Sequence, residues 1–355
     1  MLTLKKNTIV IIAVFLGLYA CKTEDKWETT PYDFKIASGY PKPSQPADNI
    51  ATEEGVALGR RLFYDVKLSE NFGQSCASCH KQEFAFSDPN QFSTGTFGQT
   101  GKRNSMALIN LAFNPFQRFF WDGRSKTLED QVLHPVQDPL EMATNWTKVV
   151  SRLQADPIYP GMFKKAFGTD KIDSVLAAKA LAQFVRTLVS FDSKFDKWIK
   201  GQATLDSVEQ AGLNLIQDLN GGDCFHCHNA EDKLFTSTKM SNNGLDFEAQ
   251  WTDLGFYNVT GLETDKAKFK TPTLRNVALT GPYMHDGRFS TLPQVIIQHY
   301  NTGGKLSPTI DVFMEYVNTP SGLDLSPNEV NAILKFLNTL TDSTFITNPK
   351  FSSPF

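Results

Sequence analysis

The sequence predicts a mainly α-helical protein built from two related halves with long loops. Helical periodicity marks its ordered stretches, no region shows the sustained alternation of a large sheet, and one series of short motifs occurs twice in the same order. The chain of 355 residues is long enough for two domains of ordinary size. We place these domains at residues 51–200 and 201–355.

The first residues indicate a secretory signal. In "MLTLKKNTIVIIAVFLGLYAC", two lysines precede a short apolar run from Ile9 to Ala20. We assign residues 1–20 to the signal and expect Cys21 to carry a lipid, with ordinary cleavage or an uncleaved anchor as the alternative. Residues 21–50 contain "YPKPSQPADN" and few apolar clusters, so we expect a lipid-anchored tether and a location in the periplasm or cell envelope.

The charge of the chain argues against one class of partner. The formal net charge is -3, and no basic run follows the signal. Nothing in this pattern favours binding of nucleic acid. We expect contact with a membrane only through the lipid on Cys21.

Three stretches have strong helical patterns. "TEEGVALGRRLFYD" (52–65) has an acidic first turn and apolar residues at helical spacing. The stretch 171–198 repeats apolar residues at the same spacing and predicts one long helix. "SPNEVNAILKFLNTL" (326–340) begins with a capping box, in which Ser326 caps the helix and Glu329 reaches back. Loops rich in Gly, Asn and Phe, such as "SDPNQFSTGTFGQTGKRN", lie between the helices.

The five cysteines point to covalently bound haem. Cys21 is the lipid site, and the other four form two C-x-x-C-H motifs, CASCH (76–80) and CFHCH (224–228), which leaves no thiol for a disulfide. This motif attaches haem c, because its two thiols bond to the two vinyl groups of the porphyrin. The predicted attachment residues are Cys76, Cys79, Cys224 and Cys227.

The histidine after each cysteine pair would ligate the haem iron, and these histidines are His80 and His228. A Cys₄ zinc centre is the main alternative, since two C-x-x-C pairs can build one. The histidines and the predicted export favour haem. A disulfide oxidoreductase is less favoured, because the motif occurs twice and without a thioredoxin-like βαβ pattern. We expect His226, inside the second motif, to be a bystander.

The motifs recur in a fixed order along the chain. CASCH is followed by GKRN (101–104) and WDGRSKTL (121–128), and CFHCH is followed by TLRN (273–276) and HDGRFSTL (285–292). The intervals between the motifs differ. The pattern therefore predicts an old internal duplication in which each half binds one haem, with the two haems facing each other across the interface.

Four stretches together resemble the bacterial di-haem cytochrome c peroxidases and their MauG-like relatives. They are "LGRRLFYDVKLSENFGQSCASCH", "GKRNSMALINLAFN", "FFWDGRSKTLEDQVLHPVQDPLEM" and "FKTPTLRNVALTGPYMHDGRFSTL", and the resemblance covers about residues 51–340. It implies two cytochrome-c-like domains. The N-terminal haem would meet hydrogen peroxide, and the C-terminal haem would receive electrons from a small cytochrome or copper protein. Members of the family are often homodimers.

The resemblance also assigns roles to individual residues. His80 would ligate the peroxidatic haem and His228 the electron-transfer haem, with Trp121 between them as a relay. Gln131 and Glu141 would line the peroxide pocket. Glu141 could take one proton from peroxide and return it to the leaving oxygen. Without the resemblance, Glu141 would be interpreted as a solvated acid and Trp121 as a core residue.

A calcium ion at the domain interface is a further implication. Asn104 would bind it together with the carbonyl oxygens of Thr280 and Pro282. Oxygen ligands of this kind suit calcium.

One position near the first haem departs from the family pattern. Peroxidases of this family carry a histidine in the loop after the first haem motif, and this histidine caps the iron in the oxidised enzyme. Thr96 stands at that position, and the loop contains no histidine. We therefore expect the first haem to be open without reductive activation, as in MauG. His134 is the only plausible substitute ligand, and we prefer a structural role for it.

The far side of the second haem is a second departure. The family methionine falls fourteen residues past the histidine of the H-D-G motif, and the same count from His285 reaches His299. Imidazole in place of thioether would lower the reduction potential. MauG uses a tyrosine in this region, so Tyr300 is the alternative. We assign Met284 to packing and His285 to the surroundings of the second haem.

Two other functions stay open beside a peroxidase. A MauG-like enzyme would use peroxide to oxidise a partner protein by long-range electron transfer. A di-haem electron carrier would not be an enzyme. Each of its irons would have two protein ligands, and it would lack the pair Gln131 and Glu141.

Overall fold

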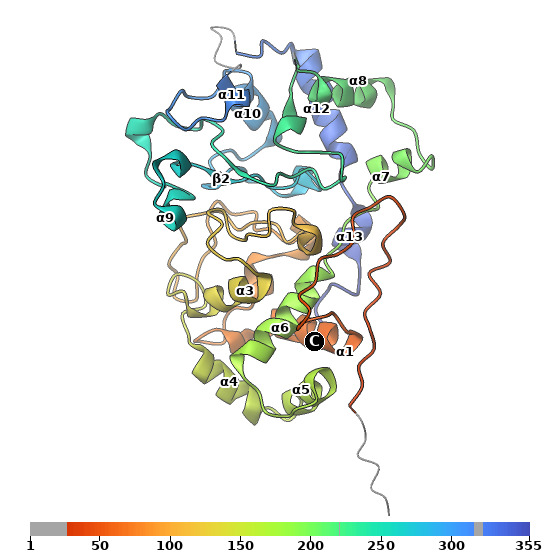
Figure 1. Cartoon of the computed structure of the whole chain (residues 1–355), viewed down its shortest axis with the longest axis vertical. Helices are drawn as coiled ribbons and strands as arrows, with labels where there is room; N and C mark the ends of the chain where they lie inside the picture. Colours follow the sequence, from red (N-terminus) through yellow and green to blue (C-terminus); the bar gives the residue numbers. More distant parts are fainter. Residues whose placement is uncertain (1–26, 220, 316–321) are drawn as a thin grey trace, which may run out of the picture.

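The computed structural model describes residues 27–219, 221–315 and 322–355. The predicted signal at residues 1–20 and the lipid site Cys21 lie outside the described residues. The fold is mainly helical, as predicted, and its two halves lie one above the other in Figure 1, with long loops stacked between them. No helix in the described part of the chain is long and apolar enough to cross a membrane.

The regular structure of the described residues consists of thirteen α-helices, short 3₁₀ and π-helical turns, and one small sheet. The first half contributes α1 (Glu53–Tyr64), α2 (Cys76–Cys79), α3 (Leu128–Gln137), α4 (Trp146–Ala155), α5 (Tyr159–Phe167), α6 (Ser174–Arg186) and α7 (Lys194–Ile199). The second half contributes α8 (Ser207–Gln217), β1 (Met240–Ser241), α9 (Tyr257–Thr260), β2 (Phe269–Lys270), α10 (Leu292–Val295), α11 (Val312–Glu315), α12 (Pro327–Thr339) and α13 (Ser343–Thr347). Strands β1 and β2 are antiparallel.

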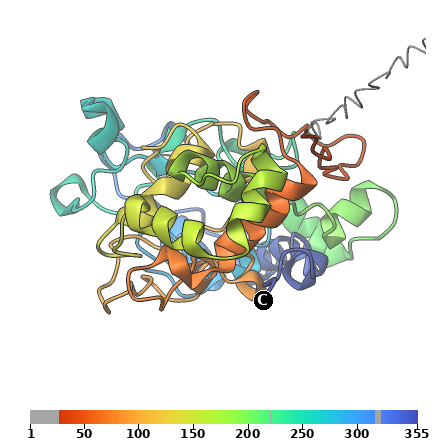
Figure 2. The same cartoon turned by 90° about the horizontal axis from the view of Figure 1, so that it is seen from below.

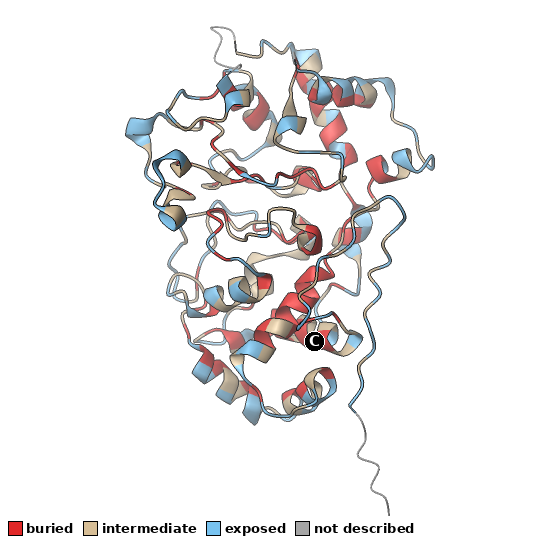
Figure 3. Cartoon of the chain, in the orientation of Figure 1, coloured by how far each residue is buried: buried red, intermediate tan, exposed pale blue. Residues whose placement is uncertain are grey.

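Each half is built around one tightly packed helix pair. In the first half, Thr52 caps α1, and Gly59 lets α1 approach α6 so closely that a Cβ there would overlap the carbonyl oxygen of Ala180. In the second half, Gly212 of α8 lies against the carbonyl oxygen of Ala332 on α12 in the same way. Figure 3 shows that the buried residues concentrate along these helices.

The predicted long helix at 171–198 is wrong, because the chain breaks between α6 and α7. The side chain of Asn110 accepts a hydrogen bond from the amide of Ser190 at 2.8 Å and donates one to its carbonyl at 3.1 Å. These bonds take the main-chain groups that a continuous helix would use. Ser193 and Asp196 then form a capping box that starts α7.

The predicted tether is not free of the protein in its described part. Residues 27–50 run along both halves, as the red segment at the side of Figure 1 shows. The indole nitrogen of Trp27 donates to the carbonyl of Lys165 at 2.9 Å, and the Tyr40 hydroxyl donates to Asp196 at 2.7 Å. The segment also buries apolar contacts of Phe34 and Ile36 against a small core cluster. Residues 27–50, which we call the strap, are therefore packed against the protein in contrast to the extended tether that the sequence suggested.

The end of the described chain packs into the first half, although the predicted boundary at residues 201–355 places it in the second. Residues 341–355, which we call the C-terminal tail, return to the first half, where Phe345 and Phe351 join the core that contains Phe63 and Phe86. Figures 1 and 2 show the C-terminus beside α1. A second domain at 201–355 would therefore include a segment that packs into the first.

Candidate active site

The first C-x-x-C-H motif holds a histidine prepared to bind a metal. Cys76 and Cys79 lie on the short helix α2, and His80 follows it. The Nδ1 atom of His80 lies 3.0 Å from the carbonyl oxygen of Phe86, so Nδ1 carries the proton and donates it. Burial lowers the pKa of His80, which keeps the ring neutral. A neutral imidazole with its Nδ1–H held by a carbonyl presents its Nε2 lone pair to iron.

The second motif repeats this arrangement. The Nδ1 atom of His228 lies 3.0 Å from the carbonyl oxygen of Pro272 and 3.3 Å from that of Phe235. Burial lowers the pKa of His228 to about 4. The alternative Cys₄ zinc centre would need both cysteine pairs at one point. Within the residues that the structure describes, no three Cys, His, Asp or Glu side chains converge as metal ligands.

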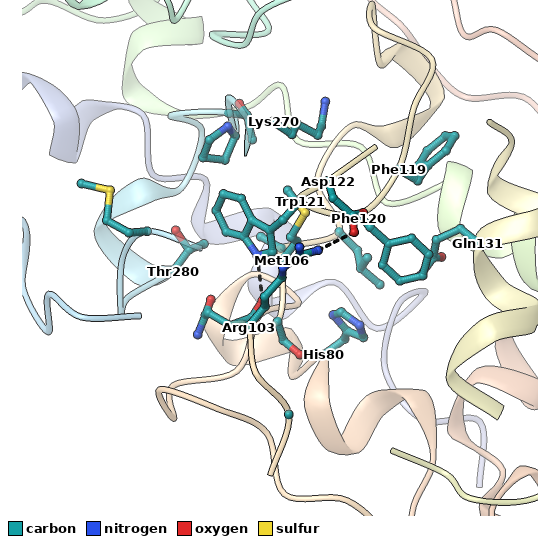
Figure 4. A pocket seen from close by; sticks show the side chains of 18 of the residues that line it. His80, Arg103, Met106, Phe119, Phe120, Trp121, Asp122, Gln131, Lys270 and Thr280 are labelled. Atoms are coloured by element: carbon teal, nitrogen blue, oxygen red, sulfur yellow. Dashed lines mark hydrogen bonds and ion pairs between the residues drawn. The ribbon is translucent and has the colours of Figure 1, made fainter. Parts of the chain in front are cut away.

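A cavity of about 1150 Å³ lies between the two halves, and Figure 4 shows it from close by. A smaller cavity of about 110 Å³ borders it near Cys76 and Cys79. His80, Gln131 and Glu141 line both cavities. The larger cavity is also lined by residues of both halves, among them Trp121, Arg124, Lys270 and Tyr283. The structure thus brings together the residues assigned to the first haem and the peroxide pocket.

Glu141 has the acid strength of a proton shuttle. It lies in the turn after α3, while Gln131 projects from α3 itself. Burial and, to a smaller extent, the carboxylate of Asp138 raise the pKa of Glu141, the guanidinium of Arg124 opposes them, and the resulting pKa is about 7. A carboxyl group that titrates near neutral pH can both accept and return a proton.

Trp121 is fixed at the boundary between the halves. Its indole nitrogen donates to the carbonyl of Asn104 at 2.8 Å, and its own carbonyl accepts from the amide of Lys270 at 2.8 Å. Arg103 binds Asp253 of the second half through two nitrogens at 2.7 and 2.8 Å. The tryptophan is therefore buried in a hydrogen-bonded frame that both halves build.

The repeated D-G-R motif lies at this boundary in both halves. The amide of Asn104 donates to the carbonyl of His285 at 2.8 Å, just as Lys270 donates to Trp121. Trp121 and His285 are the residues that precede the two D-G-R motifs. Each half thus supplies one main-chain donor and one acceptor to the other.

The glycines of the two motifs are needed for this contact. Gly123 has φ +67° and lies against Met240 of the second half, and Gly287 has φ +63° and lies against Gln91 of the first half. Only glycine adopts such backbone angles without strain. The motif therefore marks a close approach between the halves.

The Arg-Asn pairs do not correspond, contrary to the sequence interpretation. The counterpart of Asn276 is Asn110, since both have φ +56° and both precede a short 3₁₀ turn. Their amides donate to Leu188 and Leu340 at 2.9 and 3.0 Å. Arg275 has a separate role, because it forms a buried ion pair with Asp196 at 2.9 Å.

The three residues assigned to calcium all line the large cavity. They are Asn104, Thr280 and Pro282, and Thr280 is labelled among the lining residues in Figure 4. The side-chain nitrogen of Asn104 donates to the carbonyl of Asn90 at 3.1 Å.

Thr96 lies next to the pocket acid. Its amide donates to the carbonyl of Glu141 at 2.8 Å, and its hydroxyl donates to Gln74 at 3.1 Å. His134 lines neither cavity. Its side chain is 49% exposed, and its Nε2 lies 3.6 Å from Asp130.

His299 and Tyr300 lie in a π-helical turn, Ile296–Tyr300. The Nε2 atom of His299 is enclosed by protein and has no hydrogen-bond partner among the described residues, and burial lowers the pKa of His299 to about 4. Burial also raises the pKa of Tyr300, and the thiols of Cys227 and Cys224 add to this shift. Tyr300 therefore lies close enough to Cys224 and Cys227 for their thiolate charges to raise its pKa. A π-helical turn contains one residue more than an α-helical turn, which shifts any count along the helix by one.

Two residues of the cavity were missed from the sequence. Lys270 is 8% exposed, its Nζ donates to Asn114 at 2.9 Å, and burial lowers its pKa to about 8. The second is Arg124, whose positive charge lowers the pKa of Glu141. The signal available for Lys270 was a lysine directly after Phe269 in "FKTPTLRN", a stretch with no other acidic or basic residue before Arg275.

Comparisons with known proteins show the family to which this chain is related. Residues 53–204 match a family described as di-haem cytochrome c peroxidase. The chain is 34% identical to the cytochrome c551 peroxidase of Nitrosomonas europaea over 316 residues, which cover 88% of this chain and 87% of the relative. It is also 34% identical to the methylamine utilization protein MauG of Paracoccus denitrificans, with 87% of this chain and 93% of the relative covered.

A solved structure is similar along nearly its whole length. The crystal structure of a MauG-like protein associated with microbial copper homeostasis superimposes with a TM-score of 0.82 at 33% identity, covering 91% of this chain and 99% of that one.

Proposed function

Since the chain belongs to the di-haem cytochrome c peroxidase and MauG family, we propose that it reduces hydrogen peroxide to water with electrons from a small redox protein. The family implies two haem c groups, and the residues fit them, because His80 and His228 are both partly buried, both have a lowered pKa that favours the neutral ring, and both are held at Nδ1 by a carbonyl. The convergence of His80, Gln131 and Glu141 on one cavity is the observation that carries the proposal.

The chain's own residues would bind peroxide and move its protons. Reduction of hydrogen peroxide consumes two electrons and two protons and yields two waters. The haem iron supplies the one-electron chemistry. Glu141 accepts the first proton from peroxide and returns it to the distal oxygen, which then leaves as water. Gln131 orients peroxide by hydrogen bonding, and Trp121 lies between the halves where an electron must pass.

We also propose that the first site needs no reductive activation. Thr96 stands where related peroxidases carry a histidine, and its hydroxyl is held by Gln74. His134 lies outside both cavities. Electron paramagnetic resonance of the fully oxidised protein should therefore show one high-spin haem. A spectrum with two low-spin haems would contradict an open site.

For the distal ligand of the second haem, two observations favour Tyr300 over His299. The Nε2 atom of His299 is enclosed by protein, whereas a ligand atom must face the porphyrin. Tyr300 lies near Cys224 and Cys227, to which the porphyrin would be bonded. The π-helical turn accounts for the extra residue in the count from His285.

A MauG-like oxidation of a partner protein is the second candidate function. Thr96 and Tyr300 favour it, because each departs from the classical peroxidase pattern in the direction of MauG. The two functions differ in what reduces the oxidised protein after peroxide. Stopped-flow mixing with peroxide, followed by a reduced cytochrome or copper protein, tests the first. If the enzyme does not accelerate oxidation of the redox protein, the peroxidase function is contradicted and the MauG-like function is favoured.

Two further proposals, an internal duplication and a bound calcium ion, are supported by the positions of residues at the boundary between the halves. The reciprocal contacts of Asn104 with His285 and Lys270 with Trp121 support an internal duplication. The common cavity of Asn104, Thr280 and Pro282 supports a calcium ion. Export to the cell envelope, a lipid on Cys21 and a homodimer stay predictions.

A further inference from the structure

The carbonyl that orients His80 belongs to a residue in an unfavourable backbone conformation. Phe86 has φ +60°, in the left-handed region that bulky residues rarely adopt. Its side chain is fully buried. Such a conformation persists only where the surroundings enforce it. The position of the acceptor for the His80 Nδ1–H therefore depends on what packs around Phe86.

Two of the three aromatic rings around Phe86 come from the C-terminal tail. Phe345 lies 5.5 Å from it between ring centroids and Phe351 lies 6.4 Å away, while Phe63 of the first half lies at 6.1 Å. Both tail rings are buried, Phe345 to 1% and Phe351 to 6% exposure. The packing on the proximal side of the first site is thus completed by the end of the other half.

Hydrogen bonds hold the tail in place beside this site. The Tyr64 hydroxyl donates to the carbonyl of Phe351 at 2.6 Å, and the Arg60 side chain donates to the carbonyl of Ser352 at 2.7 Å. The side chain of Gln82 donates to the carbonyl of Asn348 at 2.9 Å. These bonds come from α1 and from the segment just after His80.

The second site is packed by a core cluster of its own and not by the C-terminal tail. Phe235 corresponds to Phe86 and also has a positive φ of 54°. It packs on Phe195 and Phe225, at 5.3 and 5.7 Å between centroids, and the carbonyl of Pro272 offers His228 a second acceptor. Phe195 lies on α7, before residue 201, but its side chain belongs to the same core cluster as Phe235 and Phe336.

We propose that the C-terminal tail is a positioning element for His80. It keeps the Phe86 carbonyl in the place where it accepts the His80 Nδ1–H, and this bond sets how strongly Nε2 donates to iron. The first site is thereby tied to the folding of the second half. The inference rests on the proposed function, since it concerns His80 as a haem ligand.

The test uses the full-length protein carrying its haems and compares the midpoint potentials of both haems in one spectroelectrochemical titration. Phe345→Leu removes the ring nearest Phe86. A looser Nδ1–H bond makes His80 a weaker donor, so the potential of the first haem should rise while that of the second haem stays unchanged. Its low-temperature electron paramagnetic resonance signal should shift as well. Unchanged signals, or equal shifts of both haems, would overturn the inference.

Three further variants separate positioning from general destabilisation. Tyr64→Phe loosens the same tail without removing a ring, and should shift the first haem in the same direction by less. Phe195→Leu should shift the second haem alone. Phe355→Ala is the control within the tail, because its ring lies over Arg61 at 4.3 Å and does not contact Phe86. A first-haem shift in Phe355→Ala as large as in Phe345→Leu would count against the inference.

Haem content separates this inference from the proposed function. Two covalent haems per chain, with no effect of Phe345→Leu or Tyr64→Phe on the first, would overturn the role of the tail and leave the peroxidase intact. A wild-type chain with fewer than two haems would overturn the di-haem assignment, and with it the role of His80.

Discussion

The carbonyl oxygen of Trp121 accepts a 2.8 Å hydrogen bond from the main-chain amide of Lys270. The two residues belong to different halves, and the bond has a counterpart from Asn104 to His285. Trp121, which we propose as the electron relay, is therefore fixed at both its backbone and its indole. This pair of bonds gives the two D-G-R motifs a common role. In each motif the residue before the aspartate, Trp121 or His285, offers its carbonyl oxygen to an amide of the other half.

Glu141→Gln should slow the reaction of the oxidised protein with peroxide by roughly 10²–10⁴-fold, the range for a lost general acid–base group. The amide keeps the size of the side chain but cannot accept and return a proton. Stopped-flow absorbance measures the rate. Asp130→Asn, on the exposed side of α3, is the matched control and should react like the wild type. Unchanged kinetics in Glu141→Gln would remove this residue from the mechanism.

The peroxide rate should rise with pH and reach half its maximum near pH 7, because the pKa of Glu141 is raised to about 7 and only its carboxylate accepts the first proton. Asp138→Asn removes a negative charge, lowers this pKa and should move the midpoint to lower pH. Arg124→Gln removes the opposing positive charge and should move it to higher pH. Midpoints that shift together, or not at all, would show that another group titrates.

Trp121→Phe should slow electron transfer between the haems while leaving the initial binding of peroxide unchanged. Phenylalanine fills most of the buried space but is harder to oxidise, and it lacks the indole N–H that bonds Asn104. Loss of this bond should cost about 1 kcal/mol of unfolding free energy. Rapid-scan spectra after peroxide addition measure the transfer. A wild-type rate would place the electron path elsewhere.

Tyr300→Phe should change the absorption and electron paramagnetic resonance spectra of the second haem, because it removes the phenolic oxygen. His299→Gln should leave both spectra close to those of the wild type. Comparing the two variants decides the ligand, since the opposite result would assign it to His299. The first haem in the same samples serves as the internal reference.

Gly59→Ala should destabilise the protein by about 1–3 kcal/mol or more, because the new Cβ would overlap the carbonyl oxygen of Ala180 and force α1 from α6. Gly161→Ala is the matched control, since nothing lies within 4 Å of its Cβ position on α5. There, alanine should be neutral or stabilising by up to about 1 kcal/mol. Denaturant unfolding of both variants measures the difference, and equal stabilities would contradict the close helix contact.

Local features of this chain were predictable from the sequence. The C-x-x-C-H motifs act within five residues. The capping box of Ser326 and Glu329 was predicted correctly, because a cap is a contact within one turn. The convergence of His80, Gln131 and Glu141 needed the family resemblance, since no spacing rule connects them.

Features that depend on distant partners were not predictable. The break after α6 is made by Asn110, which lies 80 residues from Ser190. The correspondence of Asn110 with Asn276 is visible only in backbone angles and hydrogen bonds. The strap at residues 27–50 looks like a tether because its apolar partners lie elsewhere in the chain.

The return of the C-terminal tail has a consequence for biogenesis. A ribosome releases the N-terminal half first, so CASCH emerges long before Phe345 and Phe351 exist. Until the tail is made, Phe86 and the segment after CASCH lack the two rings that pack on them. Attachment of haem at CASCH before the tail packs would therefore take place on an incompletely packed first half, and packing of the C-terminal tail would follow it.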